Sequence, residues 1–289
     1  MSKDYGRDHL AGLALAQIEQ TENDPRAAEE VGLRDAFYAA TGEAERLRSL
    51  AQLGLGKIRT QPIEDGSQDR SERQGKWEQS YMAQLMCDGD FAYLNGVTLV
   101  AIYSAVDAMI ESLVPSRVEA MFALRALAVL DELGVDLHSV ETAERFRAVM
   151  DSAQMGEALE KIAKSAGRVG SGGLARYERH LRVAGLANFP DRQFPGDLDV
   201  ALREIGALRD VLLHGGARVD AKAIAKAATL PKRGYPEGSF VRIGRADYRT
   251  YSSALFTFAE EVLDRMLLQV GQDRPNRLAA WRENATLNA

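Results

Sequence analysis

The chain has 289 residues, of which 46 % are hydrophobic and 27 % are charged, an ordinary balance for one large globular domain or two smaller ones. Its net charge of −6 disfavours a protein that coats nucleic acid without sequence preference, because such proteins are usually basic. The single cysteine, Cys87, excludes a disulfide framework and a cysteine-based zinc site, and we expect it to be a small core residue.

The N-terminal part of the sequence predicts a helical arm followed by a polar linker. Asp24-Pro25 suits a helix start, because Asp accepts free backbone N–H groups and Pro fits the first helical position. The helical pattern continues to about Leu53, and the almost wholly polar residues 60–75 predict a linker or a long exposed loop. The polar N-terminus lacks the apolar segment of a secretory signal.

The rest of the sequence predicts an all-α body. An apolar helix from Phe91 to Val114 is expected to end at Pro115, and Ser116 with Glu119 forms a capping box for a helix that stops at Gly134. The remaining predicted elements are helices at 139–166, 174–186, 197–214, 220–228 and 246–270, an extended piece at 239–243, and a frayed tail with Trp281. The domain prediction is an N-terminal arm and linker (1–75), a helical domain (76–272) and a C-terminal tail (273–289).

The apolar segments do not predict a membrane protein. The longest apolar stretch, Gly96 to Ile110, is too short to span a bilayer and contains Asp107. We therefore expect a soluble cytoplasmic protein with no membrane partner.

Several common catalytic motifs are missing from the sequence. There is no P-loop, and the Gly-rich segment 170–173 follows no predicted strand, so it is interpreted as a loop. The four histidines lie far apart, and none has a second ligand at metal spacing. No G-x-S-x-G elbow is present. These absences disfavour nucleotide, zinc and serine-hydrolase chemistry of the usual kinds.

A basic run occupies residues 161–182. It holds six cations and a single acidic residue, Glu178; the cations are Lys161, Lys164, Arg168, Arg176, Arg179 and Arg182. Such a run is compatible with a solvated helix face or with a local groove for a polyanion.

The predicted helix 197–214 combines a core stripe with an unusual cation. At about 100° per residue, a buried face is formed by Ala201, Ile205, Leu208 and Leu212. Leu202 and Leu213 flank this stripe and make the apolar surface wider than one core contact requires, which suggests a second subunit. Arg209 falls between the two sets, and burying it unpaired would be costly, so an anion should meet it.

The same helix ends in a histidine followed by two glycines. Gly215 would end the helix through a left-handed turn, which places His214 at the negative end of the helix dipole. Asp210 lies one turn earlier and could hydrogen-bond the imidazole, as in a tuned acid–base group. The alternative is structural: His214 caps the helix, and Arg209 forms a salt bridge.

The segment Arg-Asp-x-x-x-His-Gly-Gly resembles the signature of HEPN domains, a helical superfamily named for nucleotide binding in higher eukaryotes and prokaryotes. Arg209, Asp210 and His214 match that motif position by position. Residues 177–186 and 215–220 resemble the motif's surroundings in the subset related to abortive infection and RNA-ligase-linked proteins. The first family helix often carries an acidic residue, which residues 99–113 provide as Asp107. The resemblance covers roughly residues 85–270 and implies a HEPN-type helical bundle with an N-terminal extension.

The resemblance implies an endoribonuclease that needs no metal or cofactor. Superfamily members commonly dimerise so that two Arg…His motifs share one cleft. The implied catalytic residues are therefore Arg209, His214 and Asp210 of each copy. The implied substrate-binding residues are Asp107, Arg218 and Arg179. The expected partners are RNA, a second copy of the chain, and an antitoxin or defence-system protein.

Two alternatives remain open on the sequence alone. The acidic net charge, together with the existence of inactive relatives in the superfamily, is compatible with a non-catalytic protein that binds nucleotide or RNA or acts as an adaptor. The broad apolar flank and the N-terminal arm are compatible with a purely structural interaction protein.

Overall fold

A computed structural model describes residues 25–60, 70–132, 172–214, 216–269, 271–279 and 281. Within these ranges the chain forms helices and turns but no strand, and its extended backbone pairing is limited to a bridge between Arg218 and Phe240. The predicted all-α class is confirmed.

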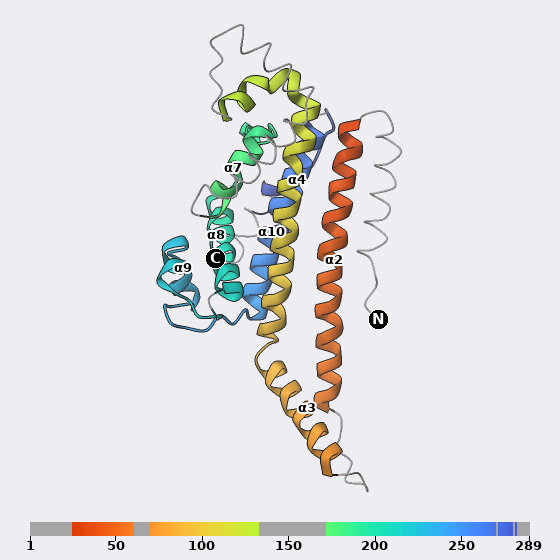
Figure 1. Cartoon of the computed structure of the whole chain (residues 1–289), viewed down its shortest axis with the longest axis vertical. Helices are drawn as coiled ribbons and strands as arrows, with labels where there is room; N and C mark the ends of the chain where they lie inside the picture. The colour runs from red at the N-terminus through yellow and green to blue at the C-terminus, as the bar shows by residue number, and fades with distance from the viewer. Residues whose placement is uncertain are drawn as a thin grey trace. The chain divides into compact units, whose positions relative to one another are not determined.

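Seven α-helices and two short 3₁₀ turns make up the described part of the chain (Figure 1). In chain order they are α2 (Pro25–Thr60), α3 (Arg70–Asp88), α4 (Ala92–Glu132), α7 (Leu174–Val183), η1 (Pro190–Arg192), α8 (Gly196–His214), α9 (Ala221–Lys226), η2 (Leu230–Arg233) and α10 (Arg245–Leu268). The predicted helices at 174–186, 197–214, 220–228 and 246–270 therefore match α7, α8, α9 and α10 within a few residues. The predicted helix at 139–166 lies outside the described residues.

The chain divides into two compact units, each assembled from separate stretches of sequence. Unit 1 comprises Met1–Tyr38, Val106–Asp199 and Thr257–Ala289, and unit 2 comprises Ala39–Ala105 and Val200–Phe256. Helices α2, α4, α8 and α10 each contribute residues to both units. The Arg209-to-His214 motif belongs wholly to unit 2.

The first two helices differ from the prediction at their ends. Helix α2 continues past Leu53 to Thr60, because Gly54 and Gly56 lie among helix-favouring Leu, Ala and Lys residues. Helix α3 begins at Arg70, so the last part of the predicted linker is helical, while residues 61–69 lie outside the described part. Polarity alone does not prevent a helix, since Arg, Glu and Gln favour helical backbone.

The predicted helix end at Pro115 is wrong. Helix α4 continues through this residue to Glu132, so Ser116 and Glu119 lie inside the helix and do not form an N-terminal capping box. A proline inside a helix removes its own N–H donor, here the one that would reach the carbonyl of Glu111, and its ring crowds that carbonyl, at a cost of about 3 kcal/mol. The following residues are rich in Ala, Leu, Met and Arg, and their helix propensity favours continuation.

The apolar stretch is longer than the segment from Gly96 to Ile110 that was identified from the sequence. In the described residues, Ala92–Leu113 of α4 is long and apolar enough to cross a membrane by length and composition. Half of its most apolar window is buried inside the protein, and core helices of soluble proteins pass the same test. A soluble protein is compatible with this finding, and the cytoplasmic location remains a prediction.

Unit 1 contains a buried network of charges that joins the start of α2 to the end of α10. The Arg34 guanidinium contacts Glu30 Oε1 at 2.5 Å, Glu260 Oε2 at 2.8 Å and Asp264 Oδ1 at 3.0 Å. Arg277 also donates to Asp264, from Nε to Oδ2 at 2.6 Å. Three carboxylates this close together need both cations, because each unpaired buried charge would be costly.

Leu278 and Trp281 pack in unit 1, so the prediction of a frayed tail at Trp281 is wrong. Leu278 is fully buried, and the indole N–H of Trp281 donates to Asp197 Oδ2 at 2.9 Å. A buried leucine and a satisfied indole N–H both stabilise a docked segment. The sequence pattern misses this because the segment makes only one helical turn.

In unit 2, two glycines allow α4 and α8 to approach closely. A Cβ on Gly206 would lie 3.3 Å from the Tyr103 hydroxyl oxygen, and a Cβ on Gly96 would lie 3.5 Å from Leu212 Cδ1. The predicted core stripe of α8 is confirmed for Ala201, Ile205 and Leu208, which are buried, while Leu212 is half-buried.

The turn between α3 and α4 is strained and is held by one buried side chain. Asp90 and Phe91 both adopt left-handed backbone, with φ of 52° and 55°, which non-glycine residues rarely do. The Asn95 amide donates to the carbonyls of Asp90 at 3.0 Å and Ile243 at 2.9 Å. Arg48 in turn donates to Asn95 Oδ1 at 3.3 Å.

Replacing Asn95 by alanine is expected to lower the free energy of unfolding by about 1–3 kcal/mol, because the buried carbonyl of Ile243 and the more exposed carbonyl of Asp90 lose their donor. Urea denaturation followed by circular dichroism measures this change. The control is Gln84→Ala, which removes an exposed amide on α3 of the same unit and should change stability by less than about 0.5 kcal/mol. Equal stability of the two variants would contradict the role assigned to Asn95.

Candidate functional site

Helix α8 places the three motif residues of unit 2 near its C-terminal end. The side chains of Arg209 and Asp210 are half-buried, whereas His214 is exposed in the last helical turn. Gly215 lies outside the described residues, but Gly216 and Ala217 both have left-handed backbone, with φ of 60° and 59°. The helix therefore ends just after His214, and the imidazole lies where solvent and a ligand can reach it.

Arg209 is held by two neighbours. Its Nη1 donates to Asp210 Oδ1 at 3.0 Å, and its guanidinium carbon lies 5.7 Å from the ring centre of Tyr103. Its Nε is buried and makes no hydrogen bond within the described part of the chain. A guanidinium has five N–H donors, so this geometry fixes the side chain without using all of them.

Asp210 bridges two cations. Its Oδ1 accepts from Arg209, and its Oδ2 accepts from the amine of Lys226 on α9. Burial raises the pKa of this carboxyl, but hydrogen bonds from Lys226 and Arg209, and the charges of both, outweigh burial and bring the pKa below its ordinary value. The carboxylate is thus ionised at neutral pH. Its hydrogen-bond partners are Arg209 and Lys226, whereas the sequence suggested that it would orient His214.

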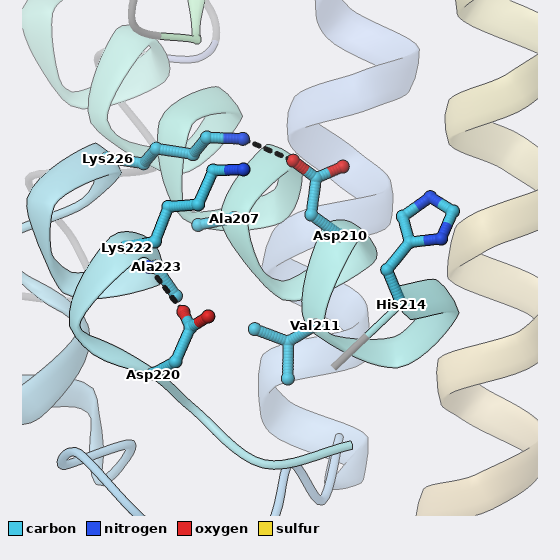
Figure 2. Close-up of a pocket in the computed structure, with 8 residues that line it drawn as sticks. All are labelled: Ala207, Asp210, Val211, His214, Asp220, Lys222, Ala223 and Lys226. Carbon is cyan, nitrogen blue, oxygen red and sulfur yellow. Dashed lines mark hydrogen bonds and ion pairs between the residues drawn. The ribbon is translucent and has the colours of Figure 1, made fainter. Parts of the chain in front are cut away.

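A groove of about 470 Å³ lies beside the motif, between α8 and the α9 region. Ala207, Asp210, Val211 and His214 line it from α8, and Asp220, Lys222, Ala223 and Lys226 line it from the other side. Figure 2 shows the two lysine side chains extending toward Asp210, while the His214 ring lies on the far side of Asp210 from them. The groove therefore has an apolar floor, a cationic wall and an imidazole at its end.

The α9 wall of the groove is built by local sequence. Asp220 caps α9 by accepting a hydrogen bond from the Ala223 N–H at 2.8 Å. The preceding backbone is fixed by Val219 N–H, which donates to Ser239 O at 2.9 Å, and by Val241 N–H, which donates to Ala217 O at 2.8 Å. The predicted extended piece at 239–243 thus supports the segment that carries the two lysines.

The three predicted substrate-binding residues lie in different units. Arg218 is in unit 2, where it donates to Gly238 O at 2.9 Å and stacks 3.9 Å from the ring centre of the exposed Phe240. Asp107 is in unit 1, where Arg176 and the Tyr177 hydroxyl donate to its carboxylate at 2.9 and 2.7 Å. The backbone of Arg179 belongs to α7 of unit 1, and its side chain lies outside the described part. Of the three, Arg218 alone shares a unit with the motif, and it contacts Gly238 and Phe240.

The described part of the basic run forms ion pairs. Arg176 pairs with Asp107 at 2.9 Å, and the exposed Arg182 pairs with Glu178 at 2.8 Å. The exposed Arg182–Glu178 pair fits the interpretation of a solvated helix face, whereas the Arg176–Asp107 pair is half-buried. Residues 161–171 of the run lie outside the described residues.

Sequence reasoning missed Lys226, Lys222 and Tyr103. The two lysines lie on a predicted short helix. They are more than ten residues from Asp210 in the sequence, so no local pattern indicates the ion pair between Lys226 and Asp210. A signal was present, because Asp220 is a strong N-cap residue and Lys222 and Lys226 share one face at a spacing of four. Tyr103 lies about a hundred residues before Arg209, and no local pattern connects the two.

Comparisons with known proteins do not assign this chain to a family. No family model matches it, and neither the curated proteins nor the solved structures give a match.

Proposed function

We propose that this protein is a metal-independent endoribonuclease of HEPN type, acting as a toxin or antiviral-defence effector. The observation that carries the proposal is the motif geometry: a guanidinium fixed by Asp210 and Tyr103 lies on the same helix end as an exposed imidazole, beside a groove with a cationic wall. The resemblance of Arg209, Asp210 and His214 to the HEPN signature adds the reaction class.

The proposed reaction uses the 2′-hydroxyl of the substrate as the nucleophile. The 2′ oxygen forms a bond to phosphorus, the bond from phosphorus to the 5′ oxygen breaks, and the products are a 2′,3′-cyclic phosphate and a 5′-hydroxyl. One proton leaves the 2′ oxygen and one joins the 5′ oxygen, so the reaction is balanced without a redox partner. His214 transfers one of these protons, and Arg209 stabilises the charge that develops on the phosphoryl oxygens.

A second copy of the chain completes the proposed site. Leu213, beside the motif, is 48 % exposed, and Tyr93 and Val97 on α4 of the same unit are 73 % and 52 % exposed. A Cβ on Gly96 would lie 3.5 Å from Leu212 Cδ1, so α4 lies next to the end of α8. Leu202, which the sequence assigned to this outer surface, is instead buried in the core. The proposed dimer surface therefore rests on Leu213, Tyr93 and Val97.

The test compares wild type with His214→Ala on a single-stranded RNA and on DNA of the same sequence, with and without EDTA. We expect wild type to cleave only the RNA, unaffected by EDTA, and to leave a 2′,3′-cyclic phosphate. His214→Ala should be slower by about 10²–10⁴-fold. Equal RNA cleavage by both proteins, or cleavage of the DNA, would refute the proposal.

A second candidate function is RNA or nucleotide binding, or an adaptor role, without catalysis. The observation in its favour is that Arg209 already donates to Asp210, so part of its guanidinium is occupied. Binding of RNA by wild type with no cleavage product would select this function over the first.

A further inference from the structure

The groove between α8 and the α9 region has a volume and lining typical of a small-ligand site. Its volume of about 470 Å³ lies within the range of pockets that hold compact organic ligands. Ala207, Val211 and Ala223 provide an apolar floor, and Ala223 is 3 % exposed. An aromatic base or a ribose ring can cover such a floor without leaving a buried polar group unpaired.

The charges around the groove leave one cation available. Asp210 pairs with Lys226, and the Asp220 carboxylate accepts the Ala223 N–H as a helix cap. Lys222 lines the groove and is exposed, and no carboxylate pairs with it among the residues that the structure describes. In Figure 2 its side chain extends along the groove toward Asp210. An anionic group in the groove would therefore meet an ammonium that is not already neutralised.

His214, the proposed proton-transfer residue, lies in the same groove as the Lys222 ammonium. It lines the groove at the end of α8. A ligand that occupies the groove thus extends from the imidazole to Lys222. Successive phosphates of a single strand are separated by one nucleoside, which is the part that the apolar floor would accommodate.

We infer that the α8–α9 groove is a nucleotide subsite for single-stranded RNA. Lys222 binds the phosphate next to the one that is cleaved, and Ala207, Val211 and Ala223 accommodate the intervening nucleoside. Lys222 is a substrate-binding residue in this assignment and takes no part in proton transfer. The inference rests on the proposed function for the direction of the strand, but binding in the groove can be measured without cleavage.

The experiment measures binding of a fluorescein-labelled 2′-O-methyl pentauridylate, which cannot be cleaved because its 2′ oxygens carry methyl groups. Fluorescence anisotropy is recorded for wild type, Lys222→Gln and Lys232→Gln. Lys232 is the matched control, an exposed lysine of η2 in the same unit that does not line the groove. Both variants change an exposed side chain and remove one positive charge, so a difference between them reports position and not net charge.

We expect Lys222→Gln to raise the Kd by about five- to tenfold and Lys232→Gln to change it by less than about twofold. The logarithm of the association constant decreases linearly with the logarithm of the salt concentration. For Lys222→Gln alone, this slope should become less steep by about 0.7, as for one lost contact to a single-stranded phosphate. No binding by wild type, or equal effects of the two variants, would overturn the subsite.

The two proposals fail separately. Cleavage of RNA that depends on His214, with Lys222→Gln equal to its control in binding, would refute the subsite and leave the endoribonuclease proposal standing. Loss of binding in Lys222→Gln, with no RNA cleavage by wild type, would refute the endoribonuclease and support the groove as a nucleotide site.

Discussion

Arg209→Lys is expected to lower kcat for RNA cleavage by about 10²–10³-fold, even though the charge is kept. The wild-type guanidinium donates to Asp210 from Nη1 and lies 5.7 Å from the ring centre of Tyr103, so its plane is fixed and other donors remain for a phosphoryl oxygen. A lysine amine is a compact point charge that cannot hold this planar geometry. Steady-state cleavage of a fluorophore–quencher RNA over a range of substrate concentrations gives kcat and KM and measures the change.

The control is Arg249→Lys, an exposed arginine of α10 in the same unit, which should cleave at a rate within about twofold of wild type. Thermal unfolding of Arg209→Lys checks that the helix end is retained. If Arg209→Lys kept the wild-type kcat and changed only KM, Arg209 would bind the substrate without stabilising the transition state.

The amphipathic helices of this protein can be predicted from its sequence, because the spacing of apolar residues and the glycines at helix ends are local signals. The stripe of Ala201, Ile205 and Leu208 predicts both α8 and its buried face, because apolar residues at helical spacing need a core. The glycine just beyond α7 obeys a local rule as well: Gly185 has a φ of 77°, the left-handed backbone that ends many helices.

Errors arise where the surrounding chain outweighs a single local signal. Pro115 is a helix breaker by local rules, yet α4 passes through it and runs on to Glu132, in a stretch rich in helix-favouring Ala, Leu and Met residues. Leu202 was expected to lie on an outer apolar surface beside the core stripe of α8. It is buried instead, since unit 2 packs around α8 on more than one side. Helical periodicity shows which positions of a helix are apolar, but it does not show how many other helices pack against them.

The candidate site also combines residues that are close in the sequence with residues that only the fold brings together. Arg209, Asp210 and His214 are close because they share one helix, so the sequence alone brings them together. Lys226 reaches Asp210 only because backbone pairing near Val219 folds α9 back onto α8. The sequence could therefore identify the motif, but not the cation that competes with His214 for the Asp210 carboxylate.

Arg265→Met is expected to lower the free energy of unfolding by about 3–5 kcal/mol, because it leaves a buried carboxylate without its main cation. Arg265 is 1 % exposed, and its Nε donates to Glu261 Oε1 at 2.9 Å. Its Nη1 donates to Leu186 O at 2.8 Å, and its guanidinium carbon lies 4.0 Å from the ring centre of Phe194. Methionine fills a similar volume, so the loss reports charge and hydrogen bonds more than packing.

The pH dependence distinguishes this cause from a simple packing defect. Burial raises the pKa of Glu261 even in the wild type, against the hydrogen bond from Arg265, and removing Arg265 raises it further. The folded variant then binds a proton more tightly than the unfolded chain, so its stability falls as pH rises above the ordinary pKa of a glutamate, near 4.5. The loss measured by urea denaturation should be larger at pH 7.5 than at pH 5, and Arg265→Met/Glu261→Gln should recover part of it. A loss that is the same at both pH values would assign the defect to packing around Phe194 and contradict the charge-based account.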